Sequence, residues 1–115
     1  MESREFAEKI CKVLSDHKAE DIVILDVRGK TEVADYYVVA SGRAKTHTRS
    51  LIEHVDEEME KLGVSPTRCE GVREGRWAVL DYGDVLVHIF NDENRVLYHL
   101  EKLWGDDKNT VKYTD

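Results

Sequence analysis

Two apolar runs with no polar interruption constrain the fold more than any other feature of this sequence. They cover residues 22–25 (IVIL) and 36–40 (YYVVA). A strand with one buried face alternates apolar and polar residues, whereas a strand covered on both faces is apolar throughout. We therefore expect buried strands over 21–27 and 36–40, with the first of them near the middle of a sheet.

Three other segments carry apolar residues at helical spacing, around 6–14, over 45–62 and from about 92 to 105. Gly63 and Gly105 follow the second and third segments, where helices commonly end. These segments therefore predict three helices with one apolar face each. The residues that set the spacing are Phe6, Ile10, Val13 and Leu14, then Leu51, Ile52, Val55, Met59 and Leu62, and last Val96, Leu97, Leu100, Leu103 and Trp104.

The remaining strands are a short one over 67–72 and a hairpin over 77–90. Their order among the helices predicts an α/β fold of the mixed α+β type, a single mixed β-sheet of about five strands flanked by about three helices. At 115 residues the chain has room for one hydrophobic core. We expect a single domain over 1–105 and a polar C-terminal tail over 106–115.

Charge and hydropathy exclude several classes of function. Seventeen basic residues against twenty-four acidic ones give a net charge of −7, which argues against binding through phosphate neutralisation. We expect little direct nucleic-acid contact and a basic protein as partner. The longest apolar runs are far shorter than the roughly 20 residues of a membrane span, and the charged N-terminus does not resemble a signal peptide. A cytoplasmic protein without membrane contact is predicted.

Cysteine and histidine spacing predicts no metal site and no cofactor. Cys11 and Cys69 share no motif and are expected to be buried free thiols. His47 and His54 lie seven residues apart on the second predicted helix, which without a third ligand favours ordinary helix-surface histidines. The turn at 41–43 (SGR) precedes that helix and is compatible with an anion on backbone amides or with simple strand termination.

The hairpin over 77–90 is the candidate functional surface. With Tyr82 and Gly83 as its two-residue loop, glycine takes the second central position and Trp77 lies opposite His88. Cross-strand partners share a face, so the hairpin has an aliphatic face, expected to meet the helices, and a mixed face. The aliphatic face holds Ala78, Leu80, Val85, Val87 and Ile89, and the mixed face holds Trp77, Val79, Asp81, Asp84, Leu86, His88 and Phe90.

The mixed face has two interpretations. Aromatic rings beside carboxylates are typical of a recognition surface with anchors and a polar rim. Alternatively, Trp77 and Phe90 belong to a second core and His88 is a buried, satisfied histidine; the residue pattern favours neither. Asp81 and Asp84 allow a metal-binding pair, but aspartates flank glycine turns at least as commonly.

Motifs along nearly the whole chain match one known family in order. They are residues 21–27 (DIxxLDV), 34–43 (ADYYVVASGR) with His47, 70–71 (EG), 77–90 (WxVxDYGDVxVHIF) and 97–104 (LYxLExLW). The segment from Trp77 to Phe90 is the most specific of them. The sequence thereby resembles the ribosomal silencing factor family, also called RsfS or Iojap-like.

The resemblance implies a function and a fold. A silencing factor binds the large ribosomal subunit through ribosomal protein fourteen, blocks association with the small subunit and represses translation when nutrients are scarce. The fold is expected to be nucleotidyltransferase-like, which supplies an alternative function as an enzyme. Such catalysis needs a Gly-Ser loop and an Asp-x-Asp pair holding metal ions, whereas this chain has Ser41-Gly42-Arg43 and no Asp-x-Asp. We therefore predict no enzyme activity; an interaction module with another partner is the third class.

Five residues are the predicted contacts with the partner. Trp77 is the central anchor, with His88 and Phe90 beside it. Asp81 is expected to receive a basic side chain, and Tyr98 on the last helix is expected at the border of the contact. The same face allows a two-fold homodimer when the ribosome is absent.

Overall fold

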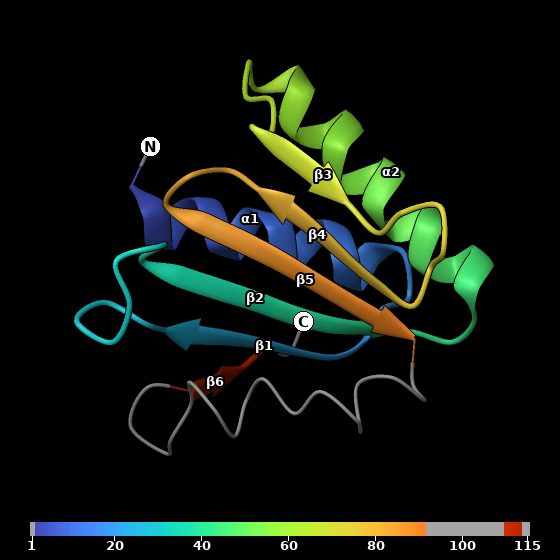
Figure 1. The fold of residues 1–115 in the computed structure, drawn as a ribbon, viewed down its shortest axis with the longest axis horizontal. Helices are drawn as coiled ribbons and strands as arrows, with labels where there is room; N and C mark the ends of the chain where they lie inside the picture. Colours follow the sequence, from blue (N-terminus) through green and yellow to red (C-terminus); the bar gives the residue numbers. More distant parts are fainter. Residues whose placement is uncertain (1, 92–109, 114–115) are drawn as a thin grey trace.

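The computed structural model describes residues 2–91 and 110–113, and the structural statements below concern these ranges. They contain two helices and six strands (Figure 1). The helices are α1 (Ser3–Asp16) and α2 (Lys45–Lys61), and the strands are β1 (Glu20–Asp26), β2 (Tyr36–Gly42), β3 (Arg68–Glu70), β4 (Trp77–Asp81), β5 (Val85–Asn91) and β6 (Thr110–Lys112).

All six strands form one sheet in the order β3-β4-β5-β2-β1-β6. The central pair β2 and β5 is parallel and every other pair is antiparallel. The predicted single mixed sheet of an α/β protein is therefore confirmed. Its strand number is corrected from five to six, because residues 110–112 of the expected tail pair with β1 as an edge strand. The helix predicted over 92–105 lies outside the described residues.

The uninterrupted apolar runs are buried on both faces, as predicted. Ile22 and Ile24 contribute to one hydrophobic cluster, whereas Val23 and Leu25 contribute to a second cluster on the opposite face. The centre of the sheet is nevertheless the β2–β5 pair, and β1 lies one strand in from the edge. The strand predicted over 67–72 is shorter, because only 68–70 pair with β4, and these residues are exposed.

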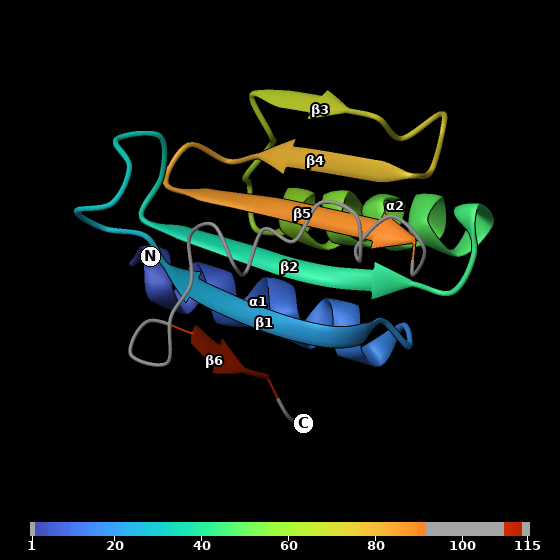
Figure 2. The same ribbon diagram turned by 60° about the horizontal axis from the view of Figure 1, so that its bottom comes forward.

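Both described helices cover the same face of the sheet (Figure 2). α1 buries Phe6, Ile10 and Leu14 at the predicted spacing. α2 ends one residue earlier than predicted, and Leu62 is 48% exposed. Gly63 then adopts φ +80°, and the amides of residues 63 and 64 bond back to the carbonyls of residues 60 and 59, a glycine-closed helix end. The hairpin's aliphatic face meets these helices, as expected.

The hairpin loop differs from the prediction by one position on each strand. The amide of Tyr82 donates to the carbonyl of Val85 at 3.0 Å, so Gly83 and Asp84 form the loop. Gly83 takes the first central position with φ +87°, a conformation that suits glycine. Trp77 consequently pairs with Phe90, not with the predicted His88. A register shift of two residues leaves every side chain on its predicted face.

Candidate functional site

The exposed part of the mixed face is one row of side chains on β4. Trp77, Val79 and Asp81 are partly exposed, whereas Ala78 and Leu80 between them are fully buried against the helices. This alternation follows from the pleat of a strand, whose successive side chains point to opposite faces. We call these three partly exposed residues the outer row of β4.

Trp77 is held in place by both residues predicted to lie beside it. Its ring stacks on Phe90 with centroids 5.2 Å apart and an interplanar angle of 23°. Its indole Nε1–H donates a hydrogen bond of 3.1 Å to Nδ1 of His88. Because these two contacts fix the ring while part of the side chain stays exposed, Trp77 presents an ordered aromatic surface.

His88 acts in this structure as a neutral hydrogen-bond acceptor. Because indole only donates, Nδ1 of His88 must accept, and the ring proton therefore belongs on Nε2. Burial lowers the pKa of His88 to about 4, so the ring is neutral at pH 7. Tyr37 lies edge-on to it at 5.0 Å. Nε2 is buried and has no hydrogen-bond partner in the part of the chain that the structure describes.

His88 and Phe90 belong to the interior more than to the surface. Their exposed fractions are 6% and 1%, and Phe90 is a member of the second hydrophobic cluster with Tyr37 and Leu86. For Phe90 the alternative of a second core therefore describes the structure, whereas His88 is buried as that alternative states but is only half satisfied, because its Nε2 has no partner among the described residues. Neither side chain therefore offers much surface of its own.

Asp81 is engaged by its own chain. Its Oδ1 accepts a hydrogen bond of 2.8 Å from the amide of Gly83, and its Oδ2 lies 3.4 Å from Nη2 of Arg68. The turn function proposed for this aspartate is thus present, and the basic side chain facing it is Arg68. A basic group from a partner has to share or replace that contact.

Two residues of β3 that the sequence did not single out complete this surface. Arg68 lies opposite Asp81 and Glu70 lies opposite Val79, which places both on the same face as the outer row. Nη1 of Arg68 is 3.7 Å from Oε1 of Glu70. The sequence could have indicated these two residues, because pairing the strand at 68–70 with the strand at 77–81 brings Arg68 opposite Asp81. Tyr98, predicted at the border of the contact, lies outside the described residues.

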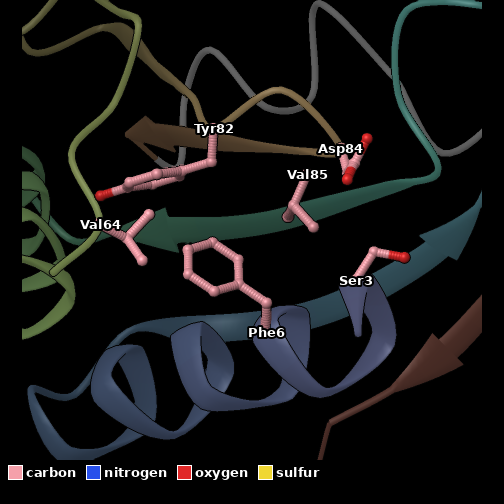
Figure 3. A pocket seen from close by; sticks show the side chains of 6 residues that line it. All are labelled: Ser3, Phe6, Val64, Tyr82, Asp84 and Val85. Atoms are coloured by element: carbon pink, nitrogen blue, oxygen red, sulfur yellow. The ribbon is translucent and has the colours of Figure 1, made fainter. Parts of the chain in front are cut away.

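A separate cavity of about 230 Å³ lies between the start of α1 and the hairpin turn (Figure 3). The rings of Phe6 and Tyr82 meet there edge to face at 5.1 Å. Burial raises the pKa of Tyr82 well above its ordinary value, so the phenol stays protonated. Ser3 and Asp84 lie together at one end of this largely apolar cavity. The residues around it are Ser3, Phe6, Val64, Tyr82, Asp84 and Val85.

The histidines of α2 join it to the end of α1. Nδ1 of His47 accepts from the amide of Arg43 at 3.0 Å, and its Nε2 lies 2.9 Å from the carbonyl oxygen of His17. The rings of His17 and His54 stack with centroids 3.6 Å apart. His47 therefore connects two elements instead of lying free on the helix surface.

Metal-binding geometry does not occur within residues 2–91 and 110–113, where no group of three or more His, Cys, Asp or Glu side chains is placed to hold an ion. Both cysteines are free thiols. Cys11 is buried as predicted, but Cys69 is exposed because β3 is an edge strand. Over the same residues, no helix is long and apolar enough to cross a membrane.

Comparison with known proteins decides the family. The family model described as "Ribosomal silencing factor during starvation" matches residues 1–115. The chain belongs to the ribosomal silencing factor family. The resemblance carried by the motifs of residues 21–104 is thereby confirmed.

Relatives within the ribosomal silencing factor family cover most of the chain. The ribosomal silencing factor RsfS of Bacillus subtilis is 38% identical over 91 residues, which are 79% of this chain and 77% of that protein. RsfS of Halalkalibacterium halodurans is 32% identical over 106 residues, 92% of this chain and 91% of that protein. A crystal structure of a Chromobacterium violaceum protein superposes with a TM-score of 0.89 at 31% identity, covering 93% of this chain and 90% of that one.

Proposed function

We propose that this protein binds the large ribosomal subunit through ribosomal protein fourteen, keeps the small subunit from joining and so represses translation. Membership in the ribosomal silencing factor family supports the proposal. The mechanism is steric: the bound protein occupies surface that the small subunit needs. No bond is made or broken, so the protein is not an enzyme and requires no cofactor. It acts in the cytoplasm, where the subunits meet.

The ordered ring of Trp77 is the observation that carries the choice of surface. Stacking on Phe90 and hydrogen bonding to His88 fix the ring before any partner arrives. An aromatic anchor that is already ordered loses little conformational entropy on binding. Trp77 is therefore the central contact, and His88 and Phe90 hold its ring in place.

The net charge of the chain favours a protein partner, and charged side chains form the rim of the contact. A net charge of −7 favours association with a basic protein, as ribosomal proteins commonly are. Asp81 at one end of the outer row, and Arg68 and Glu70 on β3, add polar groups beside Trp77 and Val79, the arrangement of a hydrophobic centre with a polar rim. Tyr98 is proposed to border the same contact.

Sucrose-gradient sedimentation of purified ribosomal subunits tests the function. With the protein added under conditions that favour association, we expect separate subunits and co-sedimentation of the protein with the large one. Without it, intact ribosomes form. If intact ribosomes form equally well in both samples, the proposal fails. If the protein leaves the large subunit unbound, an interaction module with another partner becomes the better description.

Trp77→Ala tests the surface independently of the function. Truncating a central aromatic anchor commonly costs about 2 kcal/mol or more of binding free energy, roughly thirtyfold in affinity. We expect the folded variant to lose co-sedimentation with the large subunit. Val33→Ala is the control, because Val33 is 58% exposed and belongs to the loop between β1 and β2 and not to the hairpin. Undiminished co-sedimentation of Trp77→Ala, with its fold verified by circular dichroism, excludes Trp77 as an anchor.

Two further measurements address the alternatives. Incubation with nucleoside triphosphates and magnesium tests nucleotidyl transfer, for which we expect no turnover; any turnover abolished by substitution in the chain overturns the non-enzymatic mechanism. Sedimentation equilibrium without ribosomes tests a homodimer through the outer row. Trp77→Ala is expected to shift that equilibrium towards monomer, and an unchanged equilibrium places any dimer contact elsewhere.

A further inference from the structure

Three basic side chains surround one cavity at the start of α2, in a chain that is acidic overall. The cavity has a volume of about 380 Å³ and is lined by Lys45, Arg49, Arg76 and Glu74. Lys45 and Arg49 lie one turn apart on α2, and the other two belong to the loop between β3 and β4. Figures 1 and 2 both show this loop beside the start of α2.

The backbone fixes the spacing of these cations. Gly75 has φ +69°, and a Cβ there would lie 2.7 Å from the carbonyl oxygen of Lys45, so only glycine allows this approach of loop to helix. On the other side of the loop, the carbonyl of Arg76 accepts from the amide of Asn91 at the end of β5, at 3.1 Å. The cavity is therefore built between two anchored segments.

None of the three cations has a carboxylate partner among the described residues. By contrast, Arg43 a few residues away pairs with Glu20 at 2.8 Å. Nε of Arg49 is buried and has no hydrogen-bond acceptor within the described ranges. An unpaired buried donor is costly, so the protein leaves one donor of a cavity-lining guanidinium unsatisfied.

The local electrostatics favour an anion. Three positive groups oppose the single carboxylate of Glu74 in the lining. The first turn of α2 carries no acidic residue, and Ala44 at its N-cap provides no side-chain cap. The positive end of the helix dipole is therefore uncompensated by the side chains of this turn and adds to the positive potential of the three cations. Guanidinium groups match the geometry of phosphate oxygens.

We propose that this cavity binds a phosphate group. The phosphodiester of an RNA strand and the phosphate of a free nucleotide share this chemistry. The net charge of −7 argues against a broad phosphate-neutralising surface, but it does not oppose one local site built from unpaired cations. Such a site needs no ribosomal protein and is separate from docking through Trp77.

Binding measurements on the full chain test the site. Fluorescence anisotropy with a labelled short single-stranded RNA, competed with pyrophosphate and with a nucleoside triphosphate, gives the affinities. Loss of one charge-assisted contact weakens binding by about tenfold or more, so Arg49→Gln and Arg76→Gln should each lose at least this factor. For the RNA arm, the slope of log affinity against log salt should fall by about 0.7 for each contact removed.

Two matched variants separate a built site from general attraction to cations. Lys61→Gln removes the same charge at the far end of α2, where the lysine pairs with Glu58 at 2.9 Å, and should leave binding unchanged. Glu74→Gln removes the opposing carboxylate and should tighten binding. Equal losses in Arg49→Gln and Lys61→Gln, or no binding of any probe, overturn the proposal.

The competition arm identifies the source of the phosphate. If RNA binds more tightly than pyrophosphate or nucleotide and all depend on Arg49, the site serves a phosphodiester backbone. If the small phosphates bind more tightly with the same dependence, it serves a free nucleotide. Both results support a phosphate site. Because these assays contain no ribosomes, they can fail while subunit separation succeeds, and the reverse.

Discussion

The two faces of the β4–β5 hairpin are made by alternate residues of the same strands but differ in what they offer. On the helix side, Ala78, Leu80 and Ile89 are completely buried. On the mixed side, β5 is buried as well, while the outer row of β4 stays partly exposed. The exposed surface of the mixed face is thus only one strand wide, bordered by the short edge strand β3.

The difference shows how a small protein combines a rigid core with a contact surface. The aliphatic face stabilises the fold by burial alone, which is non-directional. The mixed face uses directional contacts, namely the indole hydrogen bond from Trp77 to His88 and the stack on Phe90. Truncations on the first face should therefore cost stability alone, whereas truncating Trp77 in the outer row should also cost binding.

The largest effect is expected from truncating the helix-side face. Leu80→Ala should reduce the free energy of unfolding by about 2–5 kcal/mol, because it leaves a cavity in a fully buried site. A matched pair sharpens the comparison: Val87→Ala on this face should cost about 2–3 kcal/mol, and Val79→Ala in the outer row about 1 kcal/mol. Urea denaturation measures all three. Equal losses for the two valines would remove the distinction between the faces.

How much of this the sequence predicts depends on the kind of signal. The periodicity of apolar residues at 22–25 and 36–40 predicted strands buried on both faces, because uninterrupted burial requires an uninterrupted apolar run. The two faces of the hairpin are also predicted correctly, since a register error of two residues preserves the alternation of side chains. The motifs along the chain then predicted the family to which it belongs.

Features that depend on tertiary context were not predictable. Three residues at 110–112 carry too little pattern to distinguish a tail from an edge strand, and only pairing with β1 defines them. The exposure of Phe90 and His88 depended on whether their face was covered, which local sequence does not record. The cavity at Lys45, Arg49 and Arg76 brings together residues about thirty positions apart. Neither local sequence nor the acidic net charge of the chain indicates such a basic site.

The next largest effect concerns the protonation of His88. Burial lowers its pKa from 6.5 to about 4, so the unfolded chain binds more protons than the folded one between these values, and stability falls as the pH is lowered through them. The loss should reach about 2–3 kcal/mol near pH 4. His88→Asn, which keeps an acceptor for the indole but does not titrate, should lack this component. Parallel urea titrations from pH 7 to pH 4 that show the same slope for both proteins would refute the assignment.

A smaller effect is expected from the indole hydrogen bond itself. Trp77→Phe keeps an aromatic ring over Phe90 but leaves Nδ1 of His88 without its donor, which should cost about 1–2 kcal/mol of stability. Combining it with His88→Leu in a double-mutant cycle isolates the pair, because the second substitution removes the unsatisfied acceptor. A coupling energy near zero would mean that stacking alone orders Trp77.

The smallest effect distinguishes the two roles of Asp81. Asp81→Asn can keep the oxygen that accepts from Gly83 while removing the charge that faces Arg68. Because Arg68 is 65% exposed, the lost ion pair should cost less than about 1 kcal/mol and the difference should vanish at high salt. Asp81→Ala removes the turn hydrogen bond too and should cost about 1 kcal/mol more, independently of salt. If both variants instead lose large-subunit binding without losing stability, the carboxylate is released from Arg68 in the complex, and the mixed face contributes a charge to the partner as well as a ring.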